Sequence, residues 1–205
     1  MFYAVAEGHA GLAIDPFKAL VAPRPIAWIS TVDAAGRLNL APYSWFNAIC
    51  TSPPMVMFSS DGWKDTVAAC AETGEFVVNL ASFDLREAMN ESSAPLPRGT
   101  SEFEHTGLTP LASCLVRPPR VGEAAAALEC RVTAIQNPKS LDGRATPNHV
   151  VFGEVVGVHI RDDCLVDGRF DMVRAGVVGR CGYSDFVHVT DLFRMSRPKG
   201  GGNGA

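Results

Sequence analysis

Residues 39–66 read NLAPYSWFNAICTSPPMVMFSSDGWKDT, and this stretch sets the structural pattern of the chain. A polar-edged strand at about 43–50 ends at Ser52-Pro53-Pro54, and a continuous apolar strand follows at 55–59. Prolines are poor in central strands, so those of the stretch are expected at strand ends. After a Ser-Asp-Gly turn, KDTVAACAETG predicts a helix that begins near Lys64 and stops at Gly74.

Strand patterns of the same kind occur on both sides of this stretch, at 26–32, 37–41, 75–81, 126–136, 149–160 and 186–189. Residues 26–41 read as a β-hairpin, and the two glycines within 149–160 predict a bulge or a close backbone approach. Short helices are predicted at 15–21, 85–90 and 171–177, with a helical turn at 102–105. Because the strands mostly follow one another through tight turns, the fold class is expected to be mainly β, an antiparallel barrel with peripheral helices.

Length and composition limit what this chain is. With 205 residues, 47% of them hydrophobic, we expect one domain over 1–198 and a flexible tail at 199–205. The net charge of −4 and the lack of long Lys/Arg runs argue against nucleic acid as a partner. The apolar runs are only strand-length, and residues 1–15 lack the pattern of a secretory signal. We therefore expect no membrane association and a cytoplasmic location.

The six cysteines form no C-x-x-C pair and mostly lie in apolar segments, which predicts reduced, buried thiols. The five histidines show no ligand spacing relative to them, so no metal site is predicted. Rossmann, P-loop and nucleophile-elbow motifs are missing from the sequence. The long Pro-, Gly- and Ser-rich stretch at 92–119 is expected to be functional or to pack at a subunit contact.

The two ends of the stretch at 39–66 offer different chemistry. Ser44 and Asn47 place a hydroxyl and an amide beside aromatic residues. The helix that begins near Lys64 offers backbone N–H groups, an ammonium and the Thr66 hydroxyl. Together they suit a ligand with a flat, hydrogen-bonding apolar head and a phosphate tail. The alternative is a strand edge that satisfies its own groups and an ordinary solvated helix start.

Several motifs in order then carry a resemblance. Arg24-Pro25-Ile26, Asn39 to Ser44, Lys64-Asp65-Thr66, Glu75 to Leu80 and Phe152-Gly153-Glu154 resemble the flavin reductase-like, FMN-binding split-barrel family, and its flavoredoxin-like branch in particular. The resemblance covers roughly residues 14–198. It implies an antiparallel FMN-binding split barrel that forms a homodimer, with FMN near the subunit interface.

The resemblance also implies roles for individual residues. The isoalloxazine edge is expected to meet Ala41, Pro42, Tyr43, Ser44 and Asn47. The FMN phosphate is expected to meet Ser59, Ser60, Lys64, Asp65 and Thr66, although Asp65 contributes by capping the helix or orienting Lys64. Arg24 either reaches the phosphate or pairs across the dimer. His149 is expected to be catalytic, beside the pocket for nicotinamide, with a surface role as the alternative. The segment Arg180-Cys181-Gly182 departs from the family pattern and leaves the substrate open.

The function that follows is an FMN-dependent oxidoreductase. Hydride or electrons would pass from NAD(P)H, or from another reduced donor, through the flavin to a small-molecule or flavin acceptor. Two alternatives remain at this point. One is a flavoredoxin-like electron-transfer protein, and the other is a protein that binds FMN or haem without turnover.

Overall fold

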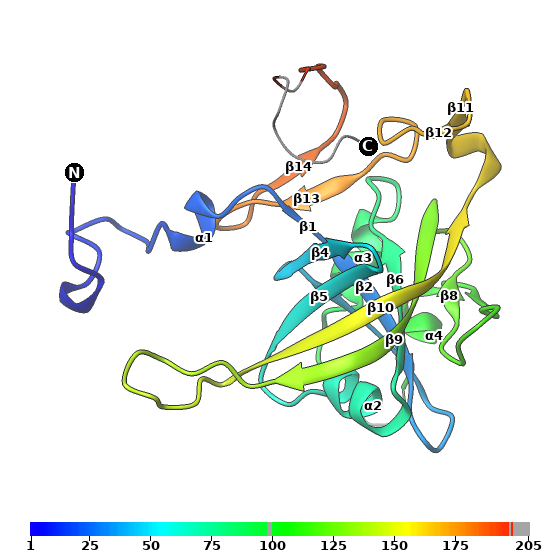
Figure 1. Ribbon diagram of the computed structural model, residues 1–205, viewed down its shortest axis with the longest axis horizontal. Helices are drawn as coiled ribbons and strands as arrows, with labels where there is room; N and C mark the ends of the chain where they lie inside the picture. Colours follow the sequence, from blue (N-terminus) through cyan, green and yellow to red (C-terminus); the bar gives the residue numbers. More distant parts are fainter. Residues whose placement is uncertain (98–99, 197, 199–205) are drawn as a thin grey trace.

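A seven-stranded antiparallel sheet forms the body of the molecule in the computed structural model, which describes residues 1–97, 100–196 and 198 (Figure 1). The strand order is β3-β2-β6-β9-β10-β5-β4. Their bounds are β2 Ala27–Val32, β3 Leu38–Tyr43, β4 Phe46–Thr51, β5 Pro54–Asp61, β6 Glu75–Leu80, β9 Ala126–Gln136 and β10 Asn148–Ile160. Edge strands β3 and β4 are consecutive in the chain, yet no ladder joins them within the described ranges. The predicted mainly β, antiparallel class is confirmed, with the sheet open between β3 and β4.

One face of the sheet encloses the larger core. Side chains from six of the seven strands and from helix α2 (Asp65–Thr73) belong to one buried cluster, so the sheet curls around it. The ring of Phe58 lies between those of Tyr43 and Phe76, at centroid distances of 4.9 and 5.5 Å. Helix α2 ends at Gly74, whose left-handed backbone conformation suits a residue without a Cβ. Both ends of α2 lie close to where the sequence predicts them.

The other face of β2 carries a second core. Helices α3 (Arg86–Glu91) and α4 (Glu102–Thr106) cover it and pack with Trp28, Leu40 and Val121. The Trp28 indole N–H donates to the Ser92 hydroxyl at 2.8 Å, which satisfies the one polar group of a fully buried ring. Every residue of β2 is therefore buried, including the polar Ser30 and Thr31.

Residues 107–122, which we call the excursion, pack on the chain's own sheet. The excursion includes β7 (Pro110–Leu111) and β8 (Arg120–Val121). Side chains of the sheet bind its backbone: Asn79 accepts from the Val121 amide at 2.7 Å, and Glu129 accepts from the Cys114 and Leu115 amides at 2.7 and 2.6 Å. These contacts hold the excursion on its own sheet, and a subunit contact for the stretch at 92–119 stays a prediction.

Glu129 is fully buried under the excursion. Burial raises the pKa of its carboxyl, but the two amide donors and the His159 ring lower that pKa by more than burial raises it. The folded protein therefore holds a carboxylate there at neutral pH.

The two ends of the chain meet in a smaller sheet of β1 (Arg24–Pro25), β13 (Val178–Arg180) and β14 (Phe186–His188). Before β1, the N-terminal arm carries the 3-10 helix η1 (Val5–Glu7) and helix α1 (Phe17–Leu20) and leads away from the body (Figure 1). No residue of either helix is buried. A 3-10 turn, η2 (Asp162–Cys164), and the hairpin β11 (Leu165–Val166) to β12 (Arg169–Phe170) complete the chain's elements.

Two sequence-based boundaries need correction. Residues 172–176 form consecutive turns and not a helix, because Gly176 adopts a positive φ of 62° and Val177 pairs with Ser82 in an isolated bridge. The strand expected at about 43–50 begins at Phe46 instead, since Tyr43 still pairs with Ala27 in β3. The bulges predicted from the glycines of β10 are confirmed, with register shifts beside Gly153 and Gly157.

Two further expectations concern a membrane-spanning segment and the C-terminal tail. No helix within the described ranges is both long enough and apolar enough to span a membrane. The tail predicted at 199–205 lies outside the described residues.

Candidate functional site

The predicted phosphate end lies where β5 runs into α2. Lys64 occupies the position before the first helical residue, and no side chain caps the helix start in this part of the structure. Both Lys64 and Asp65 are exposed. Ser59 accepts a hydrogen bond from the Asn148 amide at 3.2 Å, which leaves its own O–H able to donate. The helix start and Lys64 thus offer donors at the end of this turn, and Ser59 offers one on β5, five residues earlier in the chain.

Ser60 and Thr66 belong to the interior beneath that turn. Both are buried, and the Ser60 hydroxyl donates to the Gly62 carbonyl at 2.9 Å. Thr66 accepts from the Asn39 amide at 2.9 Å. Their side chains therefore fix the turn before α2, and the structure does not bring either hydroxyl to the surface beside Lys64.

Tyr43 is the third member of this buried polar cluster. Burial raises the pKa of its phenol, and hydrogen bonding with Thr66 and Ser60, which lowers that pKa, does not offset the burial. The hydroxyl stays protonated well above neutral pH. Tyr43 thus links the core ring stack to the helix start, and its contact with a flavin ring stays a prediction.

The predicted isoalloxazine end opens into a cavity. Pro42 and Ser44 line a space of about 350 Å³ together with Ile26, Met89, Asn90, Ser93, Arg180, Ser184 and Phe186. The Arg180 guanidinium lies over the Phe186 ring at 4.4 Å and donates to the Tyr183 carbonyl at 2.5 Å. The structure therefore joins two of the predicted residues to the segment at 180–186 that departs from the family pattern.

Ala41 and Asn47 lie on β3 and β4, the two edge strands of the large sheet. Ala41 is half-buried in β3, while Asn47 is exposed in β4, where its side-chain oxygen accepts from the Ala48 amide at 2.9 Å. Because β4 is the last strand of the sheet, it has a neighbouring strand on one side only. Its outer edge offers backbone groups to a flat ligand.

Arg24 is buried and serves the fold. Its guanidinium donates to the carbonyls of Lys18, Val21 and Cys181, the last at 3.0 Å, and it lies over the Trp45 ring at 5.1 Å. These contacts tie the N-terminal arm to the β1–β13 pair. The structure does not bring Arg24 to the start of α2.

His149 lies beside the predicted phosphate end. It pairs with Ser60 across β10 and β5, and its ring meets the Trp63 ring edge-on at 4.9 Å. Its place is therefore next to the helix start, and it does not line the cavity of Pro42 and Ser44. A catalytic contact with a nicotinamide remains a prediction for this residue.

Three residues near these sites were not singled out from the sequence. Trp63 is more than half exposed beside His149, the Trp45 carbonyl accepts from the Ser59 amide, and Asn148 binds the Ser59 hydroxyl. The only sequence signal for Trp63 was an aromatic in a turn otherwise made of small and polar residues. The other two depend on strand pairing that no local pattern reveals.

Comparison with known proteins agrees with this architecture. The family described as "Flavin reductase like domain" matches residues 20–173. An uncharacterized protein of Aquifex aeolicus is 38% identical over 174 residues, which cover 82% of this chain and 85% of that protein.

Solved structures give the same result at the level of the fold. The 2-nitrobenzoate 2-nitroreductase NbaA of Pseudomonas fluorescens has a TM-score of 0.83 and 27% identity, with 97% of each chain covered. The flavoredoxin of Desulfovibrio vulgaris (Miyazaki F) has a TM-score of 0.77 over 98% of this chain and all of that one, and its 21% identity makes it evidence for the fold alone. Since the family match spans well over half of the residues and the Aquifex relative is so similar, the chain belongs to the flavin reductase-like family.

Proposed function

We propose that this protein binds FMN and passes hydride or electrons from NAD(P)H, or from another reduced donor, to a small-molecule or flavin acceptor. The observation that carries the proposal is the uncapped start of α2, with exposed Lys64 and the Ser59 hydroxyl, beside the open edge strand β4. A phosphate suits the first part and a flat ring the second. Membership of the flavin reductase-like family supports an oxidoreductase.

The residues present fit the phosphate of FMN. A helix start carries partial positive charge and backbone N–H donors, and Lys64 adds a full positive charge. Ser59 donates its O–H, whereas Ser60 and Thr66 act from below by holding the turn. Asp65 is exposed and opposes a phosphate by charge, so its part is confined to the helix start.

The ring of FMN would lie along the opening between β3 and β4. Backbone groups of residues 41–47 and the side chains of Ser44 and Asn47 are the donors available there. N–H and O–H donors at the pyrimidine edge favour the reduced flavin, because that edge gains negative charge. When bound, FMN supplies the hydride and electron chemistry, and this chain's residues bind and orient it. His149 is proposed to position the donor.

The first test measures binding of FMN and of riboflavin, which lacks the phosphate, to the full-length protein. We expect FMN to bind more tightly, and Lys64→Met to weaken FMN about ten-fold while leaving riboflavin unchanged, since one charge-assisted contact is lost. Arg169→Met is the matched control, because Arg169 is an exposed cation on the β11–β12 hairpin. Equal affinities for the two flavins would refute the phosphate site.

The second test follows the visible flavin band of the FMN-loaded protein without oxygen. Bleaching by NADH or NADPH is the expected result. Bleaching by a reduced electron-transfer protein but not by pyridine nucleotide would exclude NAD(P)H as donor and favour a carrier. If neither the pyridine nucleotides nor the reduced electron-transfer protein bleached the flavin band, the function would be flavin binding without turnover.

We also propose that the protein forms a homodimer. Met1, Phe2, Val5 and Leu20 of the N-terminal arm are 76–95% exposed, and an arm that presents such large apolar side chains to solvent fits a surface covered by a second copy. An almost wholly apolar cavity of about 320 Å³ adds a second such surface, lined among others by Phe46, Leu128, Val158, Ile160 and Phe170. Light scattering should give twice 21.9 kDa, and the mass of one chain would refute the dimer.

A cytoplasmic location is part of the same proposal. All six cysteines are free, and three of them are buried. Such thiols suit a reducing compartment. Fractionation of the native cells, with the protein detected by antibody, tests this location.

A further inference from the structure

Three side chains of types that bind metals meet beneath the excursion. A Cys114 sulfur, a Glu129 carboxylate oxygen and a His159 ring nitrogen all lie within 4.8 Å of one another. The cluster is remote in sequence from the residues of the proposed flavin site. It joins positions separated by 15 and 30 residues, which is why no ligand spacing is visible along the chain.

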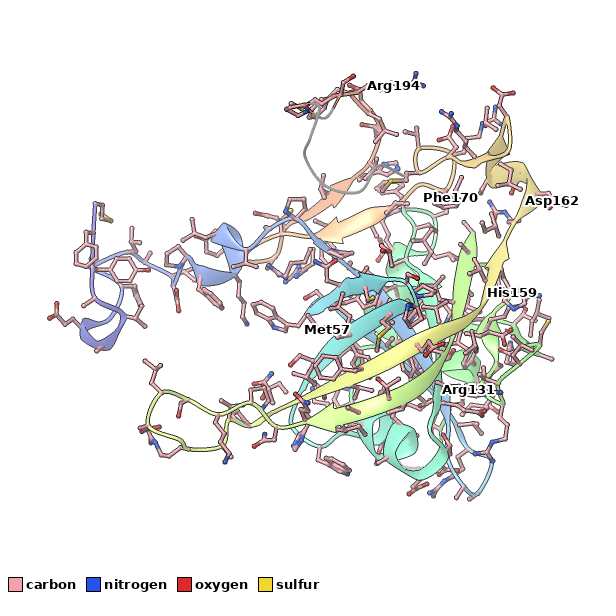
Figure 2. All side chains as sticks on the ribbon, viewed as in Figure 1. Met57, Arg131, His159, Asp162, Phe170 and Arg194 are labelled. Atoms are coloured by element: carbon pink, nitrogen blue, oxygen red, sulfur yellow. The ribbon has the colours of Figure 1, made fainter. Side chains whose placement is uncertain are left out.

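The fold builds this cluster from three directions. Glu129 on β9 and His159 on β10 share one face of the sheet, and Figure 2 shows His159 near the end of β10 that leads to Asp162. The register shift between Val155 and Gly157 falls opposite Glu129. A Cβ at Gly157 would lie at an ordinary contact distance of 3.4 Å from the Glu129 carboxyl carbon, so this position faces the carboxylate directly.

The excursion supplies the Cys114 ligand and also fixes the orientation of the Glu129 carboxylate. Its Cys114 and Leu115 amides each donate to one oxygen of Glu129, so the carboxylate is held in one orientation. The Cys114 thiol is exposed and marks the open side of the cluster. Ligands that are oriented by further hydrogen bonds, beside a position open to solvent, are typical of metal sites in proteins.

The charge of the cluster favours a cation. Glu129 is 0% exposed, and within the described residues its carboxylate has one ionisable partner, His159, at 2.5 Å. Arg131 lies close by but donates to the Leu115 carbonyl instead. A buried carboxylate is stabilised by positive charge beside it, and a bound cation would supply that charge.

The ligand types select the metal. Sulfur, imidazole nitrogen and carboxylate oxygen together suit zinc, whereas calcium and magnesium prefer oxygen ligands alone. Zinc requires bond lengths of about 2.0–2.3 Å, so the three atoms must draw in around the ion. On binding, the Cys114 thiol gives up its proton to solvent, and His159 binds the ion through Nε2 as an imidazole whose proton is on Nδ1.

We propose that Cys114, Glu129 and His159 bind one zinc ion, with water in the fourth position. The ion clamps the excursion to β9 and β10. It is independent of flavin binding, because none of the three residues lines the cavity or the helix start described above.

The test uses the full-length protein after treatment with a chelator. Zinc alone is titrated against a competing indicator, and cobalt is titrated as a spectroscopic substitute that absorbs when a thiolate binds it. We expect one equivalent of zinc, a cobalt–thiolate band and a higher melting temperature with zinc. Cys114→Ser should weaken zinc on the order of 100-fold and abolish the band.

The controls separate a metal site from an ordinary hydrogen-bonded pair. Cys114→Ser changes an exposed residue, so its metal-free melting temperature should equal that of the wild type. Cys50→Ser, at a half-buried thiol on β4, should bind zinc as the wild type does. His159→Gln should also lose zinc. Failure of the wild type to bind an equivalent of zinc, or unchanged binding by Cys114→Ser, would overturn the proposal.

Discussion

Replacing Gly153 by alanine should destabilise the protein, because β10 crosses the Phe76 ring there. A Cβ at position 153 would lie 2.5 Å from Cζ and 2.6 Å from Cε1 of Phe76, well inside normal carbon contact of about 3.5–4.0 Å. Phe76 is fully buried and packs edge-on against Phe58. The ring therefore has to move within a filled core.

The size of the effect follows from two opposing contributions. Forcing one methyl group into a packed core costs about 1–3 kcal/mol. Removing a glycine from a strand stabilises by about 0.5–1 kcal/mol. We expect Gly153→Ala to lower the free energy of unfolding by about 1–2 kcal/mol.

Urea unfolding at one fixed protein concentration measures this change, and the fixed concentration keeps any dimer contribution constant. Gly157→Ala is the matched control on the same strand, since its new Cβ would meet neighbours at an ordinary 3.4 Å. In a Phe76→Leu background, Gly153→Ala should hardly change the free energy of unfolding, because the shorter leucine side chain leaves space for the new methyl group. Equal losses in both backgrounds, or equal losses for the two glycine variants, would refute the argument from close approach.

Three further predictions concern other parts of the core. Burial raises the pKa of the Cys70 thiol from 9.0 to about 12. The stability that the neutral thiol contributes is therefore present below pH 9 and is lost as the pH rises towards 12. In Cys70→Ala, the urea midpoint should fall less steeply with rising alkaline pH than in the wild type. Asn79→Ala should cost about 1–3 kcal/mol and speed hydrogen exchange at Val121, whose buried amide loses its acceptor. Gly182→Ala should make residues 1–22 more sensitive to proteolysis, because its Cβ would lie 2.6 Å from the backbone of Ala19.

Local signals in the sequence predicted much of the sheet. The hairpin at 26–41, the helix from Lys64 to Gly74 and the long strands at 126–136 and 149–160 each carry a clear period or a turn residue. The predicted helix at 171–177 did not form because Gly176 adopts a positive φ and Val177 pairs with the distant Ser82. A local period does not reveal such long-range pairing.

The site was predicted in parts, and its assembly was not. Ser59 and Lys64 were predicted from the sequence as binding residues. Only the folded structure shows that Ser60 and Thr66 point into the interior and that the Ser59 hydroxyl still has a proton to donate. Likewise, Pro42 and Arg180 share a cavity through a small sheet whose strand at 178–180 has no signal of its own. Long-range pairing decides which neighbours a polar residue has, and a single sequence does not encode that pairing locally.

The way the excursion is held has a consequence for its tolerance of change. Asn79 and Glu129 bind its main-chain amides, and Ser30 donates to its Pro119 carbonyl. Such anchors do not depend on which side chains the excursion carries. Its exposed positions other than Cys114 are therefore a natural place to diversify a library or graft a binding loop, provided that the anchoring residues of the sheet stay unchanged.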